Sequence, residues 1–314
     1  MITLKRYNNT YREEWDNFIC NARNATFLFM RGYMDYHNDR FEDHSLMFYR
    51  DNTLYALLPA NLCDNTLYTH QGLTYGGVIL GNDATTVHVM EVFECIKKYV
   101  KENNIDRIIY KAIPWIYHLL PTEEPLYAMH RIFNMKLLER DISTTICIDK
   151  PLKWKKDRRH GLRVAHDNGV TVCKNDDYSG FWEILTTNLE QNHGVKPVHT
   201  ISEIQLLHNR FPDNIILYEA RMEGILLGGC VVYVTPQVVH TQYIAATPQG
   251  KRLGVVNAII DTLLHSNYPN CRYIDFGKST ELHSDILNEN LIYQKEGFGG
   301  RGLCYDTYEL SIVN

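Results

Sequence analysis

IILYEARM (215–222), ILLGGCVVYV (225–234) and VVHTQYIAAT (238–247) are three strand-like runs, and PQGKRLG (248–254) leads from them into VVNAIIDTLL (255–264). The three runs are rich in β-branched and aromatic residues, and short turn-forming pairs separate them. In the last stretch the apolar residues recur at helical spacing. We therefore predict a three-stranded antiparallel meander, a glycine-bearing loop and an amphipathic helix, in that order.

The segments around this stretch complete a second half of the chain. Before it, periodicity predicts helices over 153–166, 178–191 and 201–209 and a strand over 170–175. After it, CRYIDFG (271–277) and YDTYELSIV (305–313) are expected to form strands. The second half is thus predicted to be one sheet flanked by helices.

The first half shows a looser version of the same order. Strands are expected over 2–7, 45–50, 53–62, 105–113 and 142–149, and helices over 11–20, 30–41, 85–102 and 123–133. Asp51-Asn52 is a turn pair that favours a hairpin between the second and third strands. A length of 314 residues fits two domains, which we place at 1–149 and 150–314. The predicted class is α/β (α+β), with a mixed, mostly antiparallel sheet and flanking helices in each domain.

Bulk properties exclude several classes of protein. The net charge of −5 argues against a surface built throughout to neutralise phosphates. The eight cysteines are scattered without metal-ligand spacing, which indicates a reducing compartment. The opening MITLKRYNNTYREEW has no apolar signal region, and no run of apolar residues is long enough to span a bilayer. We therefore expect a cytoplasmic protein without membrane insertion and without a bound metal; the oligomeric state stays open.

The loop between the meander and the helix is the strongest candidate for binding an anion. Backbone N–H groups and the helix dipole at such a point attract phosphate, and two basic side chains add positive charge. The alternative is an ordinary strand-to-helix turn. The residues predicted to bind a cofactor are Gly250, Lys251, Arg252, Leu253, Gly254 and Val255.

This element resembles the pyrophosphate-binding element of the acyl-CoA N-acyltransferase (GNAT) superfamily, with Val256 where the family usually has glycine or alanine. Three further segments resemble the Fem-type branch: RHGLRVA (159–165) before a Gly-Val pair, YIDFG (273–277), and YQKEGFGG (293–300). The resemblance spans the second half and implies two tandem GNAT-like domains. It also implies acyl transfer, with acetyl-CoA or another acyl-CoA as the donor.

Acyl transfer to an amine needs a proton acceptor and donors for the developing oxyanion. The side chains that could serve are His240 and Tyr243 on the third meander strand, Asp275 and Lys278 after the next strand, and Tyr293 and Lys295 on a terminal loop. Each also has a structural reading as a core or surface residue. Arg159 and Arg163, four residues apart on one helix face, are predicted to bind substrate phosphates, and Lys278 is predicted to bind substrate as well.

Three functions remain open from the sequence. The first is transfer from acyl-CoA to an amine of a small molecule, a sugar or a cell-envelope peptide precursor. The second is a Fem-type ligase that uses aminoacyl-tRNA to extend a peptidoglycan precursor; the long helical arm that such ligases often carry is absent here. The third is a non-catalytic binding module. A covalent cysteine intermediate is not expected.

Overall fold

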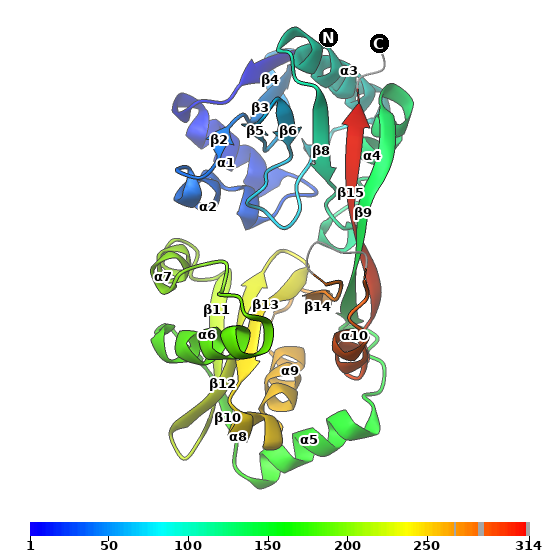
Figure 1. The fold of residues 1–314 in the computed structure, drawn as a ribbon. Coiled ribbons are helices and arrows are strands. Elements are labelled where there is room, and N and C mark those ends of the chain that lie inside the picture. The colour runs from blue at the N-terminus through cyan, green and yellow to red at the C-terminus, as the bar shows by residue number, and fades with distance from the viewer. Residues whose placement is uncertain (267, 282–285, 312–314) are drawn as a thin grey trace. The chain divides into compact units, whose positions relative to one another are not determined.

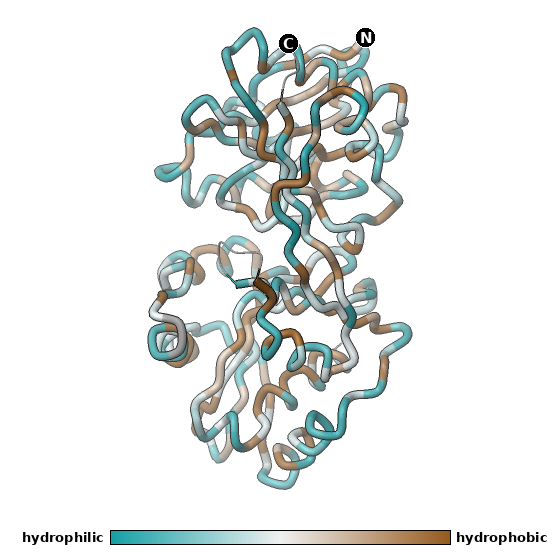
Figure 2. Tube along the Cα trace, turned by 45° about the vertical axis from the view of Figure 1, so that its right-hand side comes forward, coloured by the Kyte–Doolittle hydropathy of each residue, from teal (hydrophilic) through white to brown (hydrophobic). Residues whose placement is uncertain are grey.

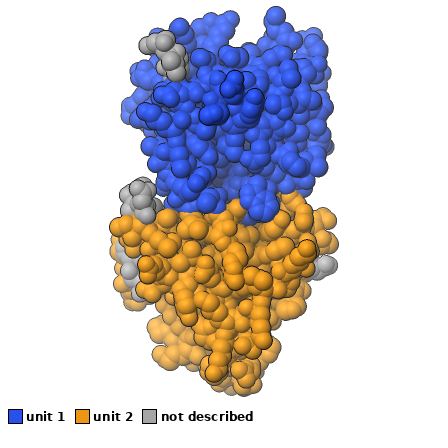
Figure 3. Space-filling model, turned by 90° about the vertical axis from the view of Figure 1, so that its right-hand side faces the viewer, with its two compact units in different colours: residues 1–141, 304–314 blue, residues 142–303 orange. Residues whose placement is uncertain are grey.

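The chain divides into two compact units in a computed structural model that describes residues 1–266, 268–281 and 286–311. Unit 1 comprises residues 1–141 together with 304–314, and unit 2 comprises residues 142–303 (Figure 3). The expected division at 149/150 differs from this one in two ways: unit 2 already begins at Ile142, and the last segment of the chain groups with unit 1. That each half is a domain of its own stays a prediction.

Unit 1 contains two sets of strands. The first is a four-stranded sheet in the order β1 (Ile2–Arg6), β3 (Leu46–Arg50), β4 (Thr53–Leu58) and β7 (Ile79–Leu80), antiparallel throughout. Asp51 and Asn52 join β3 to β4 with φ of 50° and 64°, the left-handed geometry that tight hairpins need. This confirms the predicted hairpin.

The second set is built around β8 (Arg107–Lys111). Strand β8 pairs antiparallel with β15 (Arg301–Ser311) and parallel with β6 (Thr66–Tyr68). On the far side of β6 lie β5 (Asn61–Cys63) and then β2 (Glu42–Asp43). The helices of unit 1 are α1 (Arg12–Asn21), α2 (Arg31–Met34), α3 (Thr86–Glu102) and α4 (Glu124–Ile132), with short 3-10 turns η1 (Asn9–Tyr11), η2 (Phe27–Phe29), η3 (Asp35–His37) and η4 (Trp115–Tyr117).

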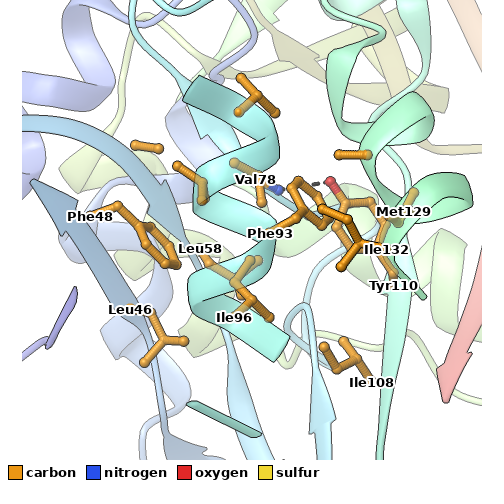
Figure 4. Packing of buried hydrophobic residues seen from close by; sticks show 14 of the residues in the cluster. Leu46, Phe48, Leu58, Val78, Phe93, Ile96, Ile108, Tyr110, Met129 and Ile132 are labelled. Carbon is orange, nitrogen blue, oxygen red and sulfur yellow. Dashed lines mark hydrogen bonds between the residues drawn. The ribbon is translucent and has the colours of Figure 1, made fainter. Parts of the chain in front are cut away.

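The core of unit 1 forms around one face of α3. Phe93 and Ile96 of this helix are at most 2% exposed and belong to one cluster with Phe48 and Met129 (Figure 4). The Tyr110 hydroxyl accepts a hydrogen bond from the Val78 amide at 2.9 Å. Each large apolar side chain buried in this way contributes roughly 1.5–3 kcal/mol. The periodic apolar positions of 85–102 are therefore the ones that fix this helix in place.

Unit 2 contains the predicted meander. Its strands follow the order β10 (Thr171–Asn175), β11 (Ile215–Met222), β12 (Ile225–Val234), β13 (Val238–Ala246), β14 (Tyr273–Lys278) and the end of β9 (Asn134–Cys147). All neighbours are antiparallel except β13 and β14, which are parallel. The meander β11–β12–β13 confirms the prediction almost residue by residue.

The helices of unit 2 are α5 (Lys156–Asp167), α6 (Ser179–His193), α7 (Ile201–Arg210), α8 (Pro248–Arg252), α9 (Val255–His265) and α10 (Glu289–Glu296). Helix α9 supplies Val255, Ile259 and Ile260 to the core of the unit, which confirms its predicted apolar face. Figure 2 shows hydrophobic and hydrophilic stretches interspersed along the trace of each unit.

Four local expectations were wrong. The helix expected over 30–41 is only α2 and η3, because Asn38 and Asp39 favour a turn. The loop 249–254 is mostly the helix α8, which begins with a proline and is capped by Thr247.

Tyr293 and Lys295 lie on the helix α10 rather than on a loop. Lys278 lies within β14 and not after it, whereas Asp275 lies inside the strand that was expected over 271–277. The end of the strand expected over 305–313 lies outside the described residues.

Candidate functional site

Backbone amides of the turn between β13 and α9 donate hydrogen bonds to acceptors within the same turn. The Gly250 amide donates to the Thr247 hydroxyl at 3.0 Å, and the Lys251 amide to the Thr247 carbonyl at 2.9 Å. The Leu253 and Gly254 amides donate to carbonyls within α8 at 3.0 and 3.3 Å. The phosphate-binding hypothesis needs these groups to face a ligand. In this conformation four of the expected donors are already engaged.

Helix α5 covers the start of α9. Gly254 has φ of +69°, and a Cβ at this residue would lie 2.1 Å from the carbonyl oxygen of Gly161. Asn257 in the first turn of α9 donates from Nδ2 to the Arg158 carbonyl at 2.8 Å. Figure 1 shows α5 running below α8 and α9. The helix end that would attract a pyrophosphate therefore packs against protein backbone, which does not fit a phosphate bound at Gly254.

The side chains of the predicted cofactor residues are spread around this turn. Lys251 donates from Nζ to Oδ1 of Asn188 at 3.0 Å, Arg252 is exposed, and Val255 is buried in the core. Gly250 is buried against β12, where a Cβ would lie 2.3 Å from the Leu227 carbonyl oxygen. Leu253 packs against the core of unit 2. As cofactor ligands these six residues stay a prediction.

His240 and Asp275 form the best-defined polar pair of unit 2. They are register partners on the parallel strands β13 and β14, and Nδ1 of His240 lies 2.8 Å from Oδ2 of Asp275. The other carboxylate oxygen, Oδ1, accepts from the hydroxyls of Ser143 and of Thr145, the latter at 3.0 Å. Asp275 is fully buried, and three donors offset the cost of burying its charge. This fixes the His240 ring with Nδ1 facing the carboxylate.

The pair lies at the point where two strands separate. The parallel pairing of β13 with β14 covers three residue pairs and ends at His240–Asp275, while β13 runs on to Ala246. Past this point the edge of β13 that faced β14 carries backbone N–H and C=O groups, the kind of edge that pairs with an added chain or ligand. A reacting group placed in this fork would lie next to His240.

Lys295 holds the end of β14 and the residue that follows it. Its Nζ donates to the carbonyls of Gly277 and Lys278, both at 2.8 Å, and to the Ser279 hydroxyl at 2.9 Å. Burial lowers the pKa of Lys295 to about 8, although the nearby Asp275 carboxylate acts in the opposite direction. Gly277 has φ of +71°, and a Cβ there would lie 3.2 Å from Cε1 of His240. Lys295 thus fastens the backbone that lies beside His240.

Tyr243 belongs to a different cluster on β13. Its hydroxyl lies 2.6 Å from Nδ1 of His199, and its ring meets that of Trp182 edge-on, with ring centroids 5.2 Å apart. Burial raises the pKa of Tyr243 to about 12, so the phenol keeps its proton at neutral pH. Among the described residues, the partners of Tyr243 are therefore different from the partners of His240.

The remaining predicted residues lie on the surface of unit 2. Tyr293 is 55% exposed, and Nζ of Lys155 lies 3.8 Å from its ring centroid. Arg159 and Arg163 are exposed on α5, and Arg159 also lines a groove of about 550 Å³ with Trp154. Lys278 is exposed at the end of β14. None of these is brought to His240 by a contact that the described residues show.

Sequence reasoning missed Ser143, Thr145, His199 and Ser279. A usable signal existed for the first two, since residues two apart in a strand share a face, and ISTTICID places two hydroxyls on one face. The pairing of β9 with β14, which brings them to Asp275, was not foreseeable from that pattern.

The described residues contain no group of three or more His, Cys, Asp or Glu side chains that could hold a metal ion. Nor is any helix in the described ranges long and apolar enough to cross a membrane.

No protein-family model matches the sequence, and no curated protein matches it. Among solved structures the chain is similar to FemX, with a TM-score of 0.70 and 11% identity over 96% of each chain. It is also similar to the C-terminal domain of a putative lysylphosphatidylglycerol synthetase from Agrobacterium fabrum, with a TM-score of 0.61 and 10% identity over 98% of this chain and 93% of that one. A tandem GNAT protein from the clavulanic acid biosynthesis pathway gives 0.55 and 9% identity over 100% and 99%. At such identities the likeness shows the fold alone, which is tandem and GNAT-like and similar to that of FemX, as the resemblance predicted.

Proposed function

We propose that this chain is an acyltransferase that acylates an amine, with His240 as the base for the attacking nitrogen. The observation that carries the proposal is the His240–Asp275 pair at the fork between β13 and β14. A carboxylate that holds Nδ1–H leaves Nε2 as the nitrogen that takes up a proton, which is the arrangement of a general base. The tandem GNAT-like fold supports the same class of reaction.

The reaction would proceed in one complex of donor, acceptor and protein. The amine attacks the acyl carbonyl while Nε2 of His240 takes its proton, and Asp275 stabilises the imidazolium that forms. Backbone N–H groups of β13 beyond His240 would donate to the oxyanion. Collapse of the tetrahedral intermediate breaks the bond to the carrier, which leaves with a proton. Lys295 acts as a positioning residue, since its ammonium already has three acceptors.

The test is an acylation assay with the purified chain. Radiolabelled acetyl-CoA is offered with three amines: glucosamine, a peptide with a free lysine, and spermidine. Labelled product that falls by roughly 10²-fold or more in His240→Gln supports the proposal, while the exposed His265→Gln should keep full activity. Product formation that survives His240→Gln unchanged would exclude His240 as the base.

A second donor has its own support in the structure. The engaged amides of α8 and the packing of α5 on Gly254 disfavour a pyrophosphate there, while exposed Arg159 and Arg163 offer charge to a longer polyanion. Aminoacyl-tRNA is therefore the alternative donor, with a peptidoglycan precursor as the acceptor that the resemblance implies.

The two donors separate in a binding experiment at two salt concentrations. Transfer from tRNA predicts affinity for an aminoacyl-tRNA fraction that falls steeply with salt and weakens in Arg159→Ala and Arg163→Ala. Arg131→Ala, exposed on α4 of unit 1, is the matched control. Transfer from CoA predicts acetyl-CoA binding that is indifferent to both arginines. Acceptor binding without turnover from either donor would favour a non-catalytic binding module.

A further inference from the structure

One segment of unit 2 concentrates positive charge in a chain that is acidic as a whole. Residues 149–167, which comprise α5 and the connection that leads into it, contain seven Lys and Arg and three Asp. This segment has a net charge of +4, while the rest of the chain has a net charge of −9. Such a separation of charge gives the protein a local positive field. The His240–Asp275 pair contains no residue of this segment.

Most of the basic side chains in this segment are free to meet a partner. Those that are exposed and have no ion-pair partner among the described residues are Lys150, Lys153, Lys156, Arg159 and Arg163. Three of them, Lys156, Arg159 and Arg163, are three and four residues apart on α5. This spacing places them on one side of the helix, which we call the basic face.

An apolar groove borders the basic face, and Arg159 and Lys153 belong to both. Its volume is about 550 Å³, within the rough range of 300–1,000 Å³ for pockets that hold small ligands. Its apolar lining consists of Ile148, Pro151, Leu152, Trp154, Leu162 and Leu264. Four of these also pack against the core of unit 2, whereas Leu152 is 46% exposed. Among the described lining residues the carboxylate is that of Asp261, which lies 3.6 Å from Nδ1 of His265.

The combination of exposed positive charge and an apolar groove indicates what kind of partner fits. A polyanion such as a nucleic acid would neutralise the Lys and Arg side chains but would leave the aliphatic surface of the groove without a matching apolar group. A purely apolar ligand would fill the groove and leave the charges unused. The surface of a bilayer with anionic phospholipids offers both, because its headgroups carry phosphate and its acyl chains begin just below them.

We propose that α5 and the connection before it bind to the surface of a membrane that contains anionic phospholipids. The basic face contacts the headgroups, and Leu152 and Trp154 contact the upper part of the acyl chains. The inference does not rest on acyl transfer by His240. Arg159 and Arg163 are also the residues that the tRNA-dependent alternative uses, so nucleic acid is the competing occupant of this surface.

The direct test is sedimentation of the full chain with phospholipid vesicles. Vesicles of phosphatidylcholine alone are compared with vesicles of phosphatidylcholine mixed with phosphatidylglycerol, which is anionic. We expect binding to the mixed vesicles only, and we expect it to weaken as salt is added, because salt screens exposed charges. Absence of binding to the mixed vesicles, or equal binding to both kinds, would overturn the proposal.

A pair of double variants tests whether this surface makes the contact. Lys153→Gln with Lys156→Gln removes two charges beside the groove and leaves the arginines in place, and it should weaken binding to the mixed vesicles by roughly tenfold or more. Lys98→Gln with Lys101→Gln removes the same charge from exposed residues of α3 in unit 1 and should leave the affinity unchanged. Equal losses in the two double variants would mean that the net charge of the chain governs binding, which contradicts the proposal.

The apolar part of the contact is what distinguishes a membrane from a nucleic acid. Phospholipids brominated on their acyl chains quench the fluorescence of a tryptophan that reaches them, so Trp154→Phe should lose most of the quenching. Trp115→Phe, at a residue 56% exposed in unit 1, should retain it. Quenching that is unchanged in Trp154→Phe would contradict the proposed contact. If a bulk tRNA fraction binds in a salt-sensitive way that the Lys153→Gln, Lys156→Gln variant loses, and the vesicles do not bind, the surface recognises nucleic acid and the membrane proposal is wrong.

Discussion

At the scale of single residues, the environment of Asp275 decides what His240 can do. The carboxylate is fully buried and accepts from three side chains, one of which is the imidazole. Removing its charge without changing its shape leaves the ring without an acceptor for Nδ1–H. The role of His240 is therefore open to test through a residue that touches no substrate.

Asp275→Asn is expected to lower kcat of the proposed transfer by roughly 10²–10⁴-fold, because the imidazole loses its orienting partner and its stabilised cation. Thr145→Val removes only one of the hydroxyls on Asp275 and should cost far less. Steady-state kinetics of the two variants make the comparison. Equal losses would mean that Asp275 acts through the fold alone.

Lys295 gives a pH dependence with a defined sign. Its pKa of about 8 lies below the ordinary lysine pKa of 10.5. Unfolding thus takes up a proton between these two pH values, and the contribution of Lys295 to the free energy of unfolding rises as pH increases through this window. The shift in pKa corresponds to a change of roughly 3 kcal/mol in the free energy of unfolding. Solvent screening of this half-buried side chain makes the change smaller.

Urea unfolding at pH 7, 9 and 10 checks this. The difference in free energy of unfolding, unmodified chain minus Lys295→Met, should become more positive as pH rises. The other titrating groups contribute equally to both proteins and cancel in this difference. A difference that stays constant across the three pH values would show that Lys295 titrates normally.

At the scale of elements, the contact between α5 and α9 depends on Gly254, and Gly169 provides a comparison outside that contact. Gly254 combines a left-handed backbone with a close approach to Gly161, where a side chain has no room. Gly169, after α5, has the same φ of +69° and nothing within 4 Å of its Cβ position. The two glycines therefore separate backbone strain from packing.

Gly169→Ala should cost about 1–2 kcal/mol through the left-handed backbone alone. Gly254→Ala should cost that amount and about 1–3 kcal/mol more, because α5 must move away from α9. Denaturant unfolding measures both. Equal losses would mean that α5 moves away freely, in which case the start of α9 could open for a phosphate.

At the scale of the whole molecule, the chain crosses between the units twice. Residues 134–141 of β9 belong to unit 1 and 142–147 to unit 2, and β15 likewise changes unit after residue 303. In unit 1, β15 pairs with β8 from Thr307↔Lys111 to Ser311↔Arg107. The end of the sequence therefore contributes to the core that the beginning of the sequence builds.

Leu310→Ala should destabilise unit 1 by about 2–5 kcal/mol, since Leu310 is 1% exposed in the cluster around α3. Hydrogen exchange should show faster exchange in β8, some 200 residues away in sequence. Cys304→Ala, exposed on the same strand, is the control. Unchanged protection of β8 in Leu310→Ala would contradict the assignment of this segment to unit 1.

The sequence by itself determined the elements whose apolar periodicity is local. The meander β11–β13 and helix α9 were predicted to within a residue or two, because alternation and helical spacing are set by neighbours along the chain. His240 and Asp275 were also identified as candidates, from residue type and strand position. Helix α10 was missed because it buries no residue and carries no apolar stripe.

Only the tertiary structure decided which residues meet. Asp275 accepts hydrogen bonds from Ser143 and Thr145, which lie more than a hundred residues away in sequence. Gly254, at the start of α9, lies close to Gly161 of α5. The groove beside α5 brings Ile148 and Leu162 to Leu264 from separate segments. Such contacts depend on strand order and helix packing, which no local pattern encodes, because periodicity fixes the face that an element buries but not the element that covers it.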